Sequence, residues 1–427
     1  MLDLRRIRHD VDEVKAALAR RGGDVSSLDR IVELDARQRQ ISIERDDLRN
    51  RIKTASKAVG TAKRDGDAAA AEVAMAESRS LGDAEKALAD EADELAAEID
   101  ELMLALPNTP SPDAPDGASE DDNVVLRSHG PDPDSFADHQ RVPHWDIGAE
   151  LGILDFEAAA RISGAMFSMY RGWGARLLRA CIQLSLDRNA DAFEEIRPPT
   201  LVRTDTMVGV GELPQFADEA YLIERDDLWA VPTAEVPLTG MGRDQVFDEA
   251  DLPIRMMAHT SCFRREAGAA GRDTRGLLRS HEFDKTELLA YTATAEQGVA
   301  AQEDVLARSE SILRDLGLSY RVLDLCTGDL GAKAARTWDI EAYAPGVGAW
   351  LEVSSVSWFA EFQGRRSNIR YRPTDRKGTE VCHTVNGSAM GWPRTVACIL
   401  ETHRRPDGRI GVPEVLRSYL GGVESIG

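Results

Sequence analysis

The chain has 427 residues, of which 42% are hydrophobic and 30% charged, a composition typical of a soluble globular protein with two or three domains. With 52 basic against 74 acidic residues, the formal net charge of -22 excludes nucleic-acid binding through a globally positive surface. No apolar run approaches the roughly 18 residues of a membrane helix, and the N-terminus lacks the apolar core of a secretory signal, so we expect a cytoplasmic protein with no membrane partner.

Two helices with heptad repeats are predicted in the first quarter of the chain. Over residues 31–59 apolar positions alternate at spacings of three and four, with Gln38 and Arg45 at two of the seam positions. After a break that contains a glycine, leucines recur every seven residues between Leu81 and Leu102. Two heptad helices joined by a short turn predict an antiparallel coiled-coil hairpin, over about residues 27–104.

The two predicted helices differ in charge. Six basic residues and no acidic one lie between Arg49 and Arg64, whereas residues 65–103 carry thirteen acidic and two basic residues. The basic side of the hairpin could grip a phosphate backbone. A solvated hairpin used for dimerisation has the same pattern, so both interpretations stay open at this point.

A proline-rich stretch follows the hairpin, and neither a helix nor a central strand can continue through its four prolines. We therefore predict three parts, which are an N-terminal domain at 1–106, a linker at 107–120 and a second domain at 121–427. Within the second domain, helices are expected at about 174–188, 296–316 and 389–404. Short apolar stretches without regular strand–helix alternation predict an α+β domain around an antiparallel sheet.

Motifs of several common enzyme classes are absent from the sequence. There is no Walker A motif, no GxGxxG that opens a helix and no GxSxG, and HEFDK at 281–285 lacks the second histidine of a metalloprotease helix. The five cysteines form no CxxC pair, so we expect neither a disulfide framework nor a zinc site. A nucleotide would have to be held in another way.

Residues 262–288 suggest such a way, because two strand-like stretches flank a loop with glycines at 268, 271 and 276, which predicts a hairpin with a long tip. Residues two apart share a face of a strand, so Arg264 and Glu266 would point together. The facing residues of the second arm are Arg279, His281, Phe283, Lys285 and Glu287. Guanidinium groups clamp phosphates, aromatic rings stack on bases and carboxylates hold ammonium groups, although a charged, solvated hairpin has the same pattern.

The segment 262–288 resembles motif 2 of the class II aminoacyl-tRNA synthetases, and the wider match is to the bacterial-type seryl-tRNA synthetases. Residues 163–177 and 196–202 resemble motif 1, the dimer interface of the family, and residues 385–403 resemble motif 3. Further matches in the expected order are 208–216, 231–238, 320–331, 350–357 and 362–372. The resemblance implies a serine–tRNA ligase that forms seryl-adenylate from L-serine and ATP and then passes serine to the terminal ribose of serine tRNA.

The resemblance also implies residues that hold ATP. Arg264 would hold the α-phosphate and the incoming carboxylate, and Arg394 the γ-phosphate side, so these two are the catalytic candidates. Glu266 would contact the adenine amino group, Phe283 would stack on adenine, and Ser280 would offer main-chain hydrogen bonds. The remaining ATP positions are Arg265, Glu352, Val353, Ser354 and Ser355.

Glu352 and Ser355 match the family positions that ligate Mg²⁺, a hard cation suited to oxygen ligands. They are three residues apart, so an ideal strand would place them on opposite faces. A bend or bulge near Val353 and Ser354 is therefore required if both are to face ATP.

Serine recognition is implied in the same way. Glu287 and Glu235 would bind the ammonium and hydroxyl regions of the substrate. A small polar pocket would be completed by Thr233, Ala234, Arg264, Asn386 and Ser388. Unpaired polar groups would reject alanine, while rejection of threonine would depend on pocket volume.

The family resemblance implies a homodimer in which the arm of one subunit presents serine tRNA to the other subunit's site. The expected arm contacts are Arg49, Arg51, Lys53 and Lys57. Two alternatives to a serine–tRNA ligase are an adenylating enzyme with another acceptor and an inactive regulator that binds tRNA. The arm speaks against the first, and the intact set of ATP residues speaks against the second.

Several positions depart from the family pattern. Val356 and Trp358 replace small and polar residues, and Trp392 with Pro393 replaces a small pair, so we expect two indoles beside the site. Such a wall would suit a duplicate synthetase that tolerates an inhibitor or supplies seryl-tRNA to a biosynthetic pathway. The sequence does not separate these roles from housekeeping.

Overall fold

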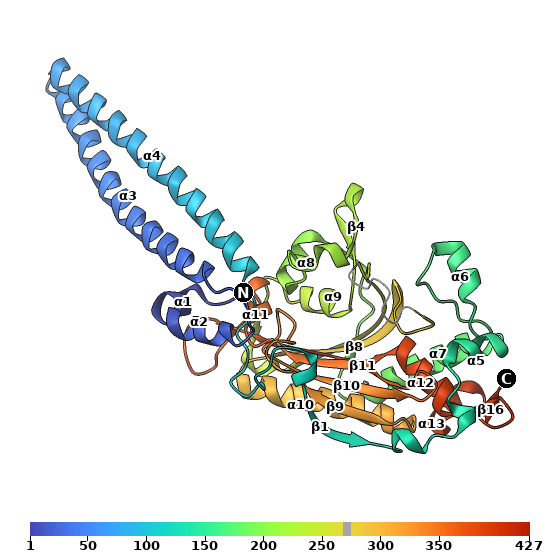
Figure 1. The fold of residues 1–427 in the computed structure, drawn as a ribbon. Helices are drawn as coiled ribbons and strands as arrows, with labels where there is room; N and C mark the ends of the chain where they lie inside the picture. Colours follow the sequence, from blue (N-terminus) through green and yellow to red (C-terminus); the bar gives the residue numbers. More distant parts are fainter. Residues whose placement is uncertain (268–274) are drawn as a thin grey trace. The chain divides into compact units, whose positions relative to one another are not determined.

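The computed structural model describes residues 1–267 and 275–427, which form two compact units (Figure 1). The first unit contains residues 2–19 and 23–107. The second contains Met1, residues 20–22 and residues 108–427. Among the residues described, no helix is long and apolar enough to cross a membrane.

The first unit consists of two short helices followed by two long ones. These are α1 (Leu4–His9), α2 (Val11–Ala19), α3 (Ser27–Arg64) and α4 (Ala68–Ala105). Three ion pairs join α3 to α4, and as the residue number rises along α3 that of the partner falls along α4. They are Arg30–Glu98, Arg37–Glu91 and Arg45–Glu85. This order makes the pair antiparallel, and the predicted helical hairpin, here called the arm, is confirmed.

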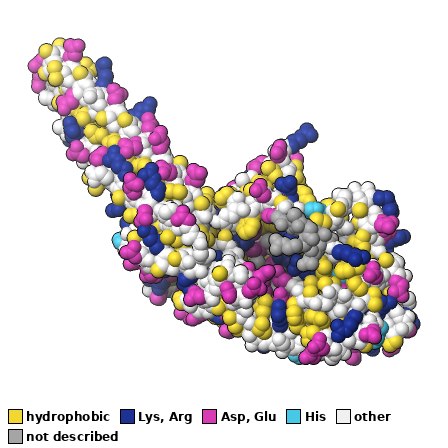
Figure 2. Space-filling model, viewed as in Figure 1, with side chains coloured by type: hydrophobic (Ala, Val, Ile, Leu, Met, Phe, Trp, Pro, Cys, Tyr) yellow, Lys and Arg dark blue, Asp and Glu magenta, His cyan; other side chains and the backbone are white. Residues whose placement is uncertain are grey.

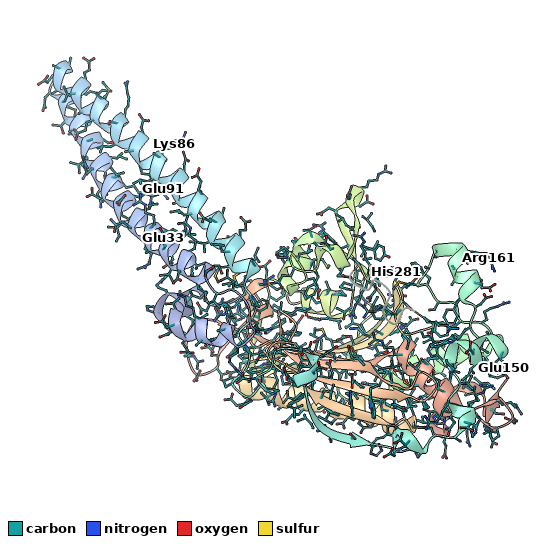
Figure 3. All side chains as sticks on the ribbon, viewed as in Figure 1. Glu33, Lys86, Glu91, Glu150, Arg161 and His281 are labelled. Carbon is teal, nitrogen blue, oxygen red and sulfur yellow. The ribbon has the colours of Figure 1, made fainter. Side chains whose placement is uncertain are left out.

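The heptad positions explain why the arm forms. Ile31 and Ile41 of α3 and Leu81 of α4 are buried between the helices, while charged residues cover the outside (Figures 2 and 3). Arg45 takes a seam position and hydrogen-bonds Glu85, which holds the pKa of the Glu85 carboxyl below its ordinary value. The charged seam residue is thus paired across the hairpin.

The second unit is built on an eight-stranded sheet with the strand order β1-β9-β10-β11-β14-β8-β7-β2, antiparallel except for the pair β2–β7. The strands are β1 (Val124–His129), β2 (Glu194–Glu195), β7 (Ile254–Phe263), β8 (Glu282–Thr292), β9 (Tyr320–Asp324), β10 (Arg336–Ala344), β11 (Ala349–Trp358) and β14 (His383–Gly391). The predicted α+β architecture on an antiparallel sheet is confirmed.

Three helices share the main apolar core with this sheet, through residues such as Leu177, Val305 and Val396. They are α7 (Trp173–Asn189), α10 (Ala295–Asp315) and α12 (Trp392–Thr402). The first two match the predicted helices. The prediction that the third begins near Ala389 is wrong, because β14 continues to Gly391. Pro393 lies in the first turn of α12, where a missing N–H costs no helical hydrogen bond.

Smaller elements surround the sheet. The helices are α5 (His144–Glu150), α6 (Phe156–Ser163), α8 (Thr204–Val210), α9 (Glu235–Gly240), α11 (Phe362–Arg366) and α13 (Glu414–Arg417). The short strands are β3 (Leu201–Arg203), β4 (Tyr221–Ile223), β5 (Leu228–Ala230), β6 (Val246–Asp248), β12 (Arg370–Arg372), β13 (Glu380–Val381), β15 (Ile410–Gly411) and β16 (Ser425–Ile426). Helices α8 and α9 pack together beside β3, β4 and β5 (Figure 1).

The proline-rich segment after the arm belongs to the second unit from Asn108 onward. The backbone N–H groups of Asn108 and Ser111 donate to the carbonyls of Ala332 and Ala335, both at 2.7 Å. These bonds satisfy main-chain groups that prolines prevent from joining a helix or a sheet. Within the segment predicted as a linker, 107–120, the residues Asn108 and Ser111 are therefore hydrogen-bonded inside the second unit.

Candidate active site

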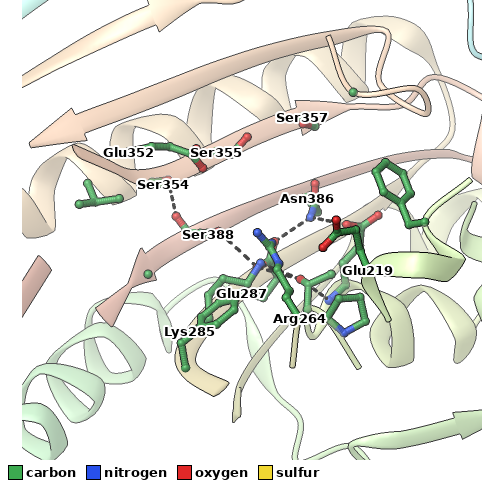
Figure 4. A pocket seen from close by; sticks show the side chains of 18 of the residues that line it. Glu219, Arg264, Lys285, Glu287, Glu352, Ser354, Ser355, Ser357, Asn386 and Ser388 are labelled. Carbon is green, nitrogen blue, oxygen red and sulfur yellow. Dashed lines mark hydrogen bonds and ion pairs between the residues drawn. The ribbon is translucent and has the colours of Figure 1, made fainter. Parts of the chain in front are cut away.

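A cavity of about 520 Å³ lies over the sheet of the second unit, between the β7–β8 hairpin and strands β11 and β14 (Figure 4). Figure 2 shows acidic side chains gathered at this hollow. The residues predicted from sequence that line it are Thr233, Glu235, Arg264, Glu266, Ser280, Phe283, Glu287, Glu352, Val353, Ser354, Ser355, Asn386, Ser388 and Arg394. Two predicted residues do not line it, because Arg265 is exposed on the outside and Ala234 is fully buried behind the wall.

The closed end of the cavity is a buried cluster of carboxylates and amides. Strands β8 and β14 place Glu287 directly opposite Ser388, and the two-residue period puts Asn386 on the same face. The side-chain amide of Asn386 donates to Glu287 Oε1 at 2.7 Å and to Glu235 Oε2 at 3.0 Å. One amide thus holds two carboxylates from different elements close together.

Buried cations balance these carboxylates. Lys285 Nζ lies 2.6 Å from Glu287 Oε2 and donates to Thr233 Oγ1 at 2.7 Å. Lys333 Nζ lies 2.8 Å from Glu235 Oε1 and also contacts Glu212. The sequence prediction placed Lys285 on this face without a role and missed Lys333.

The carboxylate of Glu235 accepts hydrogen bonds from three side chains of the protein itself. Its Oε1 accepts from Lys333 and, at 2.6 Å, from Gln363 Nε2, and these partners lie 98 and 128 residues away in sequence. No local pattern marks Gln363 or Lys333, because only the fold brings them to Glu235. A ligand therefore finds Oε2 as the more accessible oxygen of this carboxylate.

The electrostatics of this cluster follow from burial and from neighbouring charges. Burial raises the pKa of Glu235, and Lys333 opposes that rise. Burial also disfavours the charge of Lys333, but the carboxylates of Glu212 and Glu235 outweigh it and raise the lysine pKa above its ordinary value. Lys333 is therefore a permanent cation beneath the cavity.

The predicted bulge in β11 is confirmed. The register between β10 and β11 slips by one residue at Val353, so Val353 has no partner on β10. Because of this slip, Glu352 and Ser355 both line the cavity although they are three residues apart. Asp339 lies opposite Ser355 on β10 and is half-buried. Removal of this carboxyl from water and the nearby charge of Glu352 raise the pKa of Asp339, while a hydrogen bond from Ser355 opposes the rise.

The open end of the cavity carries the guanidinium groups. Arg394, in the first turn of α12, donates from Nε to the Leu278 carbonyl at 2.8 Å and from Nη1 to the Glu352 carbonyl at 2.9 Å. The Arg264 guanidinium lies 5.2 Å from the centre of the Phe283 ring. Two guanidinium groups and one aromatic ring that line the same cavity are suited to a nucleotide.

The ends of the hairpin depart from ideal strands. Strand β7 stops at Phe263, and Glu266 has a positive φ of 51°, so the prediction that Arg264 and Glu266 share a strand face is wrong. Both still line the cavity, and Glu266 is held by Arg279 at 2.7 Å. His281 instead packs its ring against Phe167 (Figure 3), and the loop glycines predicted at 268 and 271 lie outside the described residues.

The prediction that two indoles border the site is wrong. Val356 and Trp392 are buried in the main core, and the Trp392 indole N–H donates to Thr286 Oγ1 at 3.2 Å. Trp358 packs on the far side of β11 and stacks on the His383 ring. The strand alternation turns these residues away while Ser355 and Ser357 face the cavity, and Pro393 alone of the four altered residues lines it.

The four arm residues expected to contact tRNA differ in whether they form ion pairs within the arm. Arg49 lies 3.0 Å from Glu85, and Arg51 is 3.9 Å from an aspartate one turn earlier. Lys53 and Lys57 are exposed and, within the part of the chain that the structure describes, form no ion pair. The two lysines are the freer cations on this surface.

Comparison with known proteins agrees with this fold and site. A family model described as the tRNA synthetase class II core domain (G, H, P, S and T) matches residues 221–403, which hold most of the cavity. A second model, the seryl-tRNA synthetase N-terminal domain, matches residues 1–110. The fold and the site therefore define a class II synthetase core joined to a helical arm.

Relatives match over the full length. The serine–tRNA ligase of Geobacillus kaustophilus is 44% identical over 99% of both chains, and that of Geobacter sulfurreducens is 43% identical over 100% of both. A seryl-tRNA synthetase from Pyrococcus horikoshii, solved with ATP, is 34% identical with a TM-score of 0.92 and covers 100% of this chain and 99% of its own. The Naegleria fowleri cytoplasmic enzyme, solved with AMP, is 26% identical with a TM-score of 0.88, over 100% of this chain and 98% of its own. The chain belongs to the seryl-tRNA synthetase family, whose members are ATP-dependent aminoacyl-tRNA ligases.

Proposed function

We propose that the cavity binds ATP and L-serine side by side, joins them as seryl-adenylate, and then passes serine to serine tRNA delivered by the arm. The observation that carries this proposal is the charge order along one cavity, with buried carboxylates at the closed end and guanidinium groups at the open end. An amino acid with its ammonium group at the closed end would turn its carboxylate toward the phosphates. The related structures solved with ATP and with AMP support a nucleotide at such a site.

The first step needs positioning and charge neutralisation more than proton transfer. The serine carboxylate attacks the α-phosphate in line, the new carboxyl–phosphate bond forms, and pyrophosphate leaves with the electron pair of the broken bond. Arg264 would neutralise charge at the α-phosphate, and Arg394 would do so toward the γ-phosphate. Phe283 and Glu266 would hold adenine by stacking and by a hydrogen bond.

Serine would be recognised by the buried cluster. Glu287 would receive the ammonium group, with Thr233 and Ser388 as neighbouring hydroxyls at 3.4 Å from Glu287 Oε2. The substrate hydroxyl would reach Glu235 Oε2 and Asn386. A substrate without that hydroxyl would leave buried polar groups unpaired, which is costly.

Magnesium fits the oxygens at the open end. Glu352 and Ser355 line the cavity together because of the β11 bulge, and a carboxylate with a hydroxyl is a donor set suited to this ion. Among the described residues, no group of three or more His, Cys, Asp or Glu side chains could hold a metal, so further ligands would come from ATP and water. The ion would supply charge neutralisation on the phosphates.

The proposed activity is tested by exchange of labelled pyrophosphate into ATP, without tRNA and across the twenty amino acids. We expect exchange with serine alone, because the other amino acids either lack a side-chain hydroxyl or, like threonine, are larger than serine at the closed end. Exchange with a different amino acid would contradict the proposed specificity. An absence of exchange with any of them would contradict adenylation altogether.

We propose that the arm binds serine tRNA, that the chain acts as a homodimer in the cytoplasm, and that motif 1, around α7, forms the dimer interface. The dimer would let the arm of one subunit serve the cavity of the other. Sedimentation velocity measures the assembly, and a fully active monomer would contradict it. No observation here favours a specialised duplicate role, because the indoles that suggested one face away from the cavity.

The arm predicts a selective effect on tRNA. Replacing Lys53 and Lys57 with glutamate is expected to raise the KM for serine tRNA by about tenfold or more, because two phosphate contacts become repulsive. Serine-dependent pyrophosphate exchange should not change. The matched control reverses the same charge on the acidic helix α4, at Arg79 and at Lys86, of which Lys86 is labelled in Figure 3. An equal rise in KM for both double variants would show a general charge effect and contradict a specific contact.

A further inference from the structure

A fully buried histidine–glutamate pair, so far without a role, joins α5 to α12, which lie side by side (Figure 1). His144 Nδ1 lies 2.8 Å from Glu401 Oε1, and the backbone N–H of His144 donates to the same oxygen at 2.9 Å. Glu401 Oε2 accepts from the backbone N–H groups of Gly346 and Val347, at 2.7 and 3.2 Å. Both oxygens of this buried carboxylate are therefore satisfied, by the start of α5 and by one loop.

The other nitrogen of the His144 ring reaches the active-site hairpin. The backbone N–H of Leu277 donates to His144 Nε2 at 2.9 Å. A backbone N–H is always a donor, so Nε2 is the bare nitrogen and the ring proton is on Nδ1, from which it is donated to Glu401. The contacts thus fix one neutral tautomer of the ring, with a carboxylate behind it and a loop amide in front.

The residues just before Leu277 are held by the same end of α5. Gly276 has φ +67°, and a Cβ there would stand 2.7 Å from Trp145 Cε3, so only glycine fits this close approach. The Arg275 guanidinium lies 4.7 Å from the Trp145 ring centre and 3.9 Å from Asp146. Three successive residues at the start of α5 therefore contact three successive residues of the hairpin stem.

The contacts close into a circuit through the cavity wall. The carbonyl of Leu278, the residue that follows Leu277, accepts from Arg394 Nε at 2.8 Å. Arg394 and Glu401 lie seven residues apart on α12, two turns along the same side of the helix. One rigid helix therefore carries both the arginine that faces ATP and the carboxylate that orients His144.

We propose that His144 and Glu401 are positioning residues for ATP, which act by holding the Leu277 amide so that the Leu278 carbonyl orients Arg394. Neither side chain lines the cavity. The inference rests on the proposed function, since it uses the role of Arg394 at the phosphates. It assigns the start of α5 to the ATP end of the site, and the serine cluster on β8 and β14 lies outside this circuit.

Two amide variants, each of which reproduces one ring nitrogen, separate the two contacts of the ring. In H144N the side-chain amide occupies the place of Nδ1, so it can still donate to Glu401 but leaves the Leu277 amide unpaired. In H144Q the amide oxygen occupies the place of Nε2, so it can accept from Leu277 while the bond to Glu401 is lost. Each variant removes one hydrogen bond of a buried residue, so the pair is matched in size of disturbance.

Equilibrium dialysis of ATP with Mg²⁺ is the primary readout, with serine-dependent exchange alongside it. We expect H144N to weaken ATP binding about tenfold more than H144Q, with an unchanged KM for serine in both variants. Equal ATP affinities, or a stronger loss in H144Q, would overturn the proposal. If the parent protein itself binds no ATP, the proposed function fails first, and the two failures are thus distinguished.

A third variant tests the same circuit without replacing either residue of the buried pair. Gly276→Ala places a methyl group against His144 and Trp145 and is expected to weaken ATP binding as H144N does. Thermal unfolding is recorded for all three variants. If both His144 variants fail to fold, an unchanged ATP affinity in Gly276→Ala overturns the proposal, and a selective loss of ATP affinity supports it.

Discussion

Replacement of Arg264 by glutamine is expected to lower the rate of serine-dependent pyrophosphate exchange by about 100- to 1000-fold, the usual cost of losing one donor at the reacting centre. Glutamine keeps a hydrogen-bond donor but loses the positive charge and the two-pronged geometry that a phosphate and a carboxylate share. The rate is measured at saturating serine and ATP. Since Arg264 is exposed, its loss should shift the thermal unfolding midpoint little.

Two controls sharpen this experiment. Arg264→Lys keeps the positive charge but loses the planar fork of the guanidinium group. Its exchange rate should therefore lie between that of Arg264→Gln and that of the parent protein. Arg225→Gln, on the exposed turn between β4 and β5, makes the same chemical change outside the cavity and should leave the exchange rate as it is. An Arg264→Gln variant that exchanges at the parent rate would remove Arg264 from the proposed mechanism.

Replacement of Glu287 by glutamine is expected to raise the KM for serine by about 100-fold or more, as for one partner of a buried charge pair. Glu287 is fully buried and lies 2.6 Å from Lys285, so the substitution also leaves a buried ammonium group without its counter-charge. That loss should destabilise the fold by up to about 3–5 kcal/mol. Exchange kinetics measure the KM for serine, and thermal unfolding measures the loss of stability. The affinity for ATP, measured by equilibrium dialysis, should not change.

A double variant separates stability from recognition. Lys285→Met together with Glu287→Gln removes both charges, so the unfolding midpoint should recover while the affinity for serine does not. Glu310→Gln is the matched control, because Glu310 is also buried and paired with an arginine but lies outside the cavity. Recovery of serine affinity in the double variant would show that Glu287 acts only through stability.

The arm is the part of the fold most fully predicted from sequence. Its seam repeats every seven residues over two helices of 38 residues each, and such a long periodic signal outweighs the polar exceptions at Gln38 and Arg45. The structure explains one exception, since Arg45 pairs with Glu85 across the hairpin. The separate roles of the four predicted tRNA contacts did not follow from sequence, because ion pairs with α4 distinguish Arg49 from Lys53.

Within the catalytic unit, local rules predicted some features and failed at others. The bulge at Val353 was predicted from the family resemblance together with spacing, because two residues that match Mg²⁺ ligands but stand three apart had to share a face. The start of the last helix was misplaced, because apolar residues around Ala389 suit either a buried strand or a helix, and only the first-turn place of Pro393 distinguishes them. The orientation of Trp358 was likewise undetermined until the strand register was known.

The sequence by itself determined the class of fold and the arm, and most of the site residues it predicted do line the cavity, because heptad periods and ordered motifs are local properties of the chain. Only the tertiary structure decided which partners surround those residues. Lys333 and Gln363 reach Glu235 from 98 and 128 residues away, and His144 reaches Leu277 from 133 residues away. Buried polar groups are hydrogen-bonded, and their partners are set by the fold. Contacts between residues so far apart in sequence leave no spacing pattern along the chain.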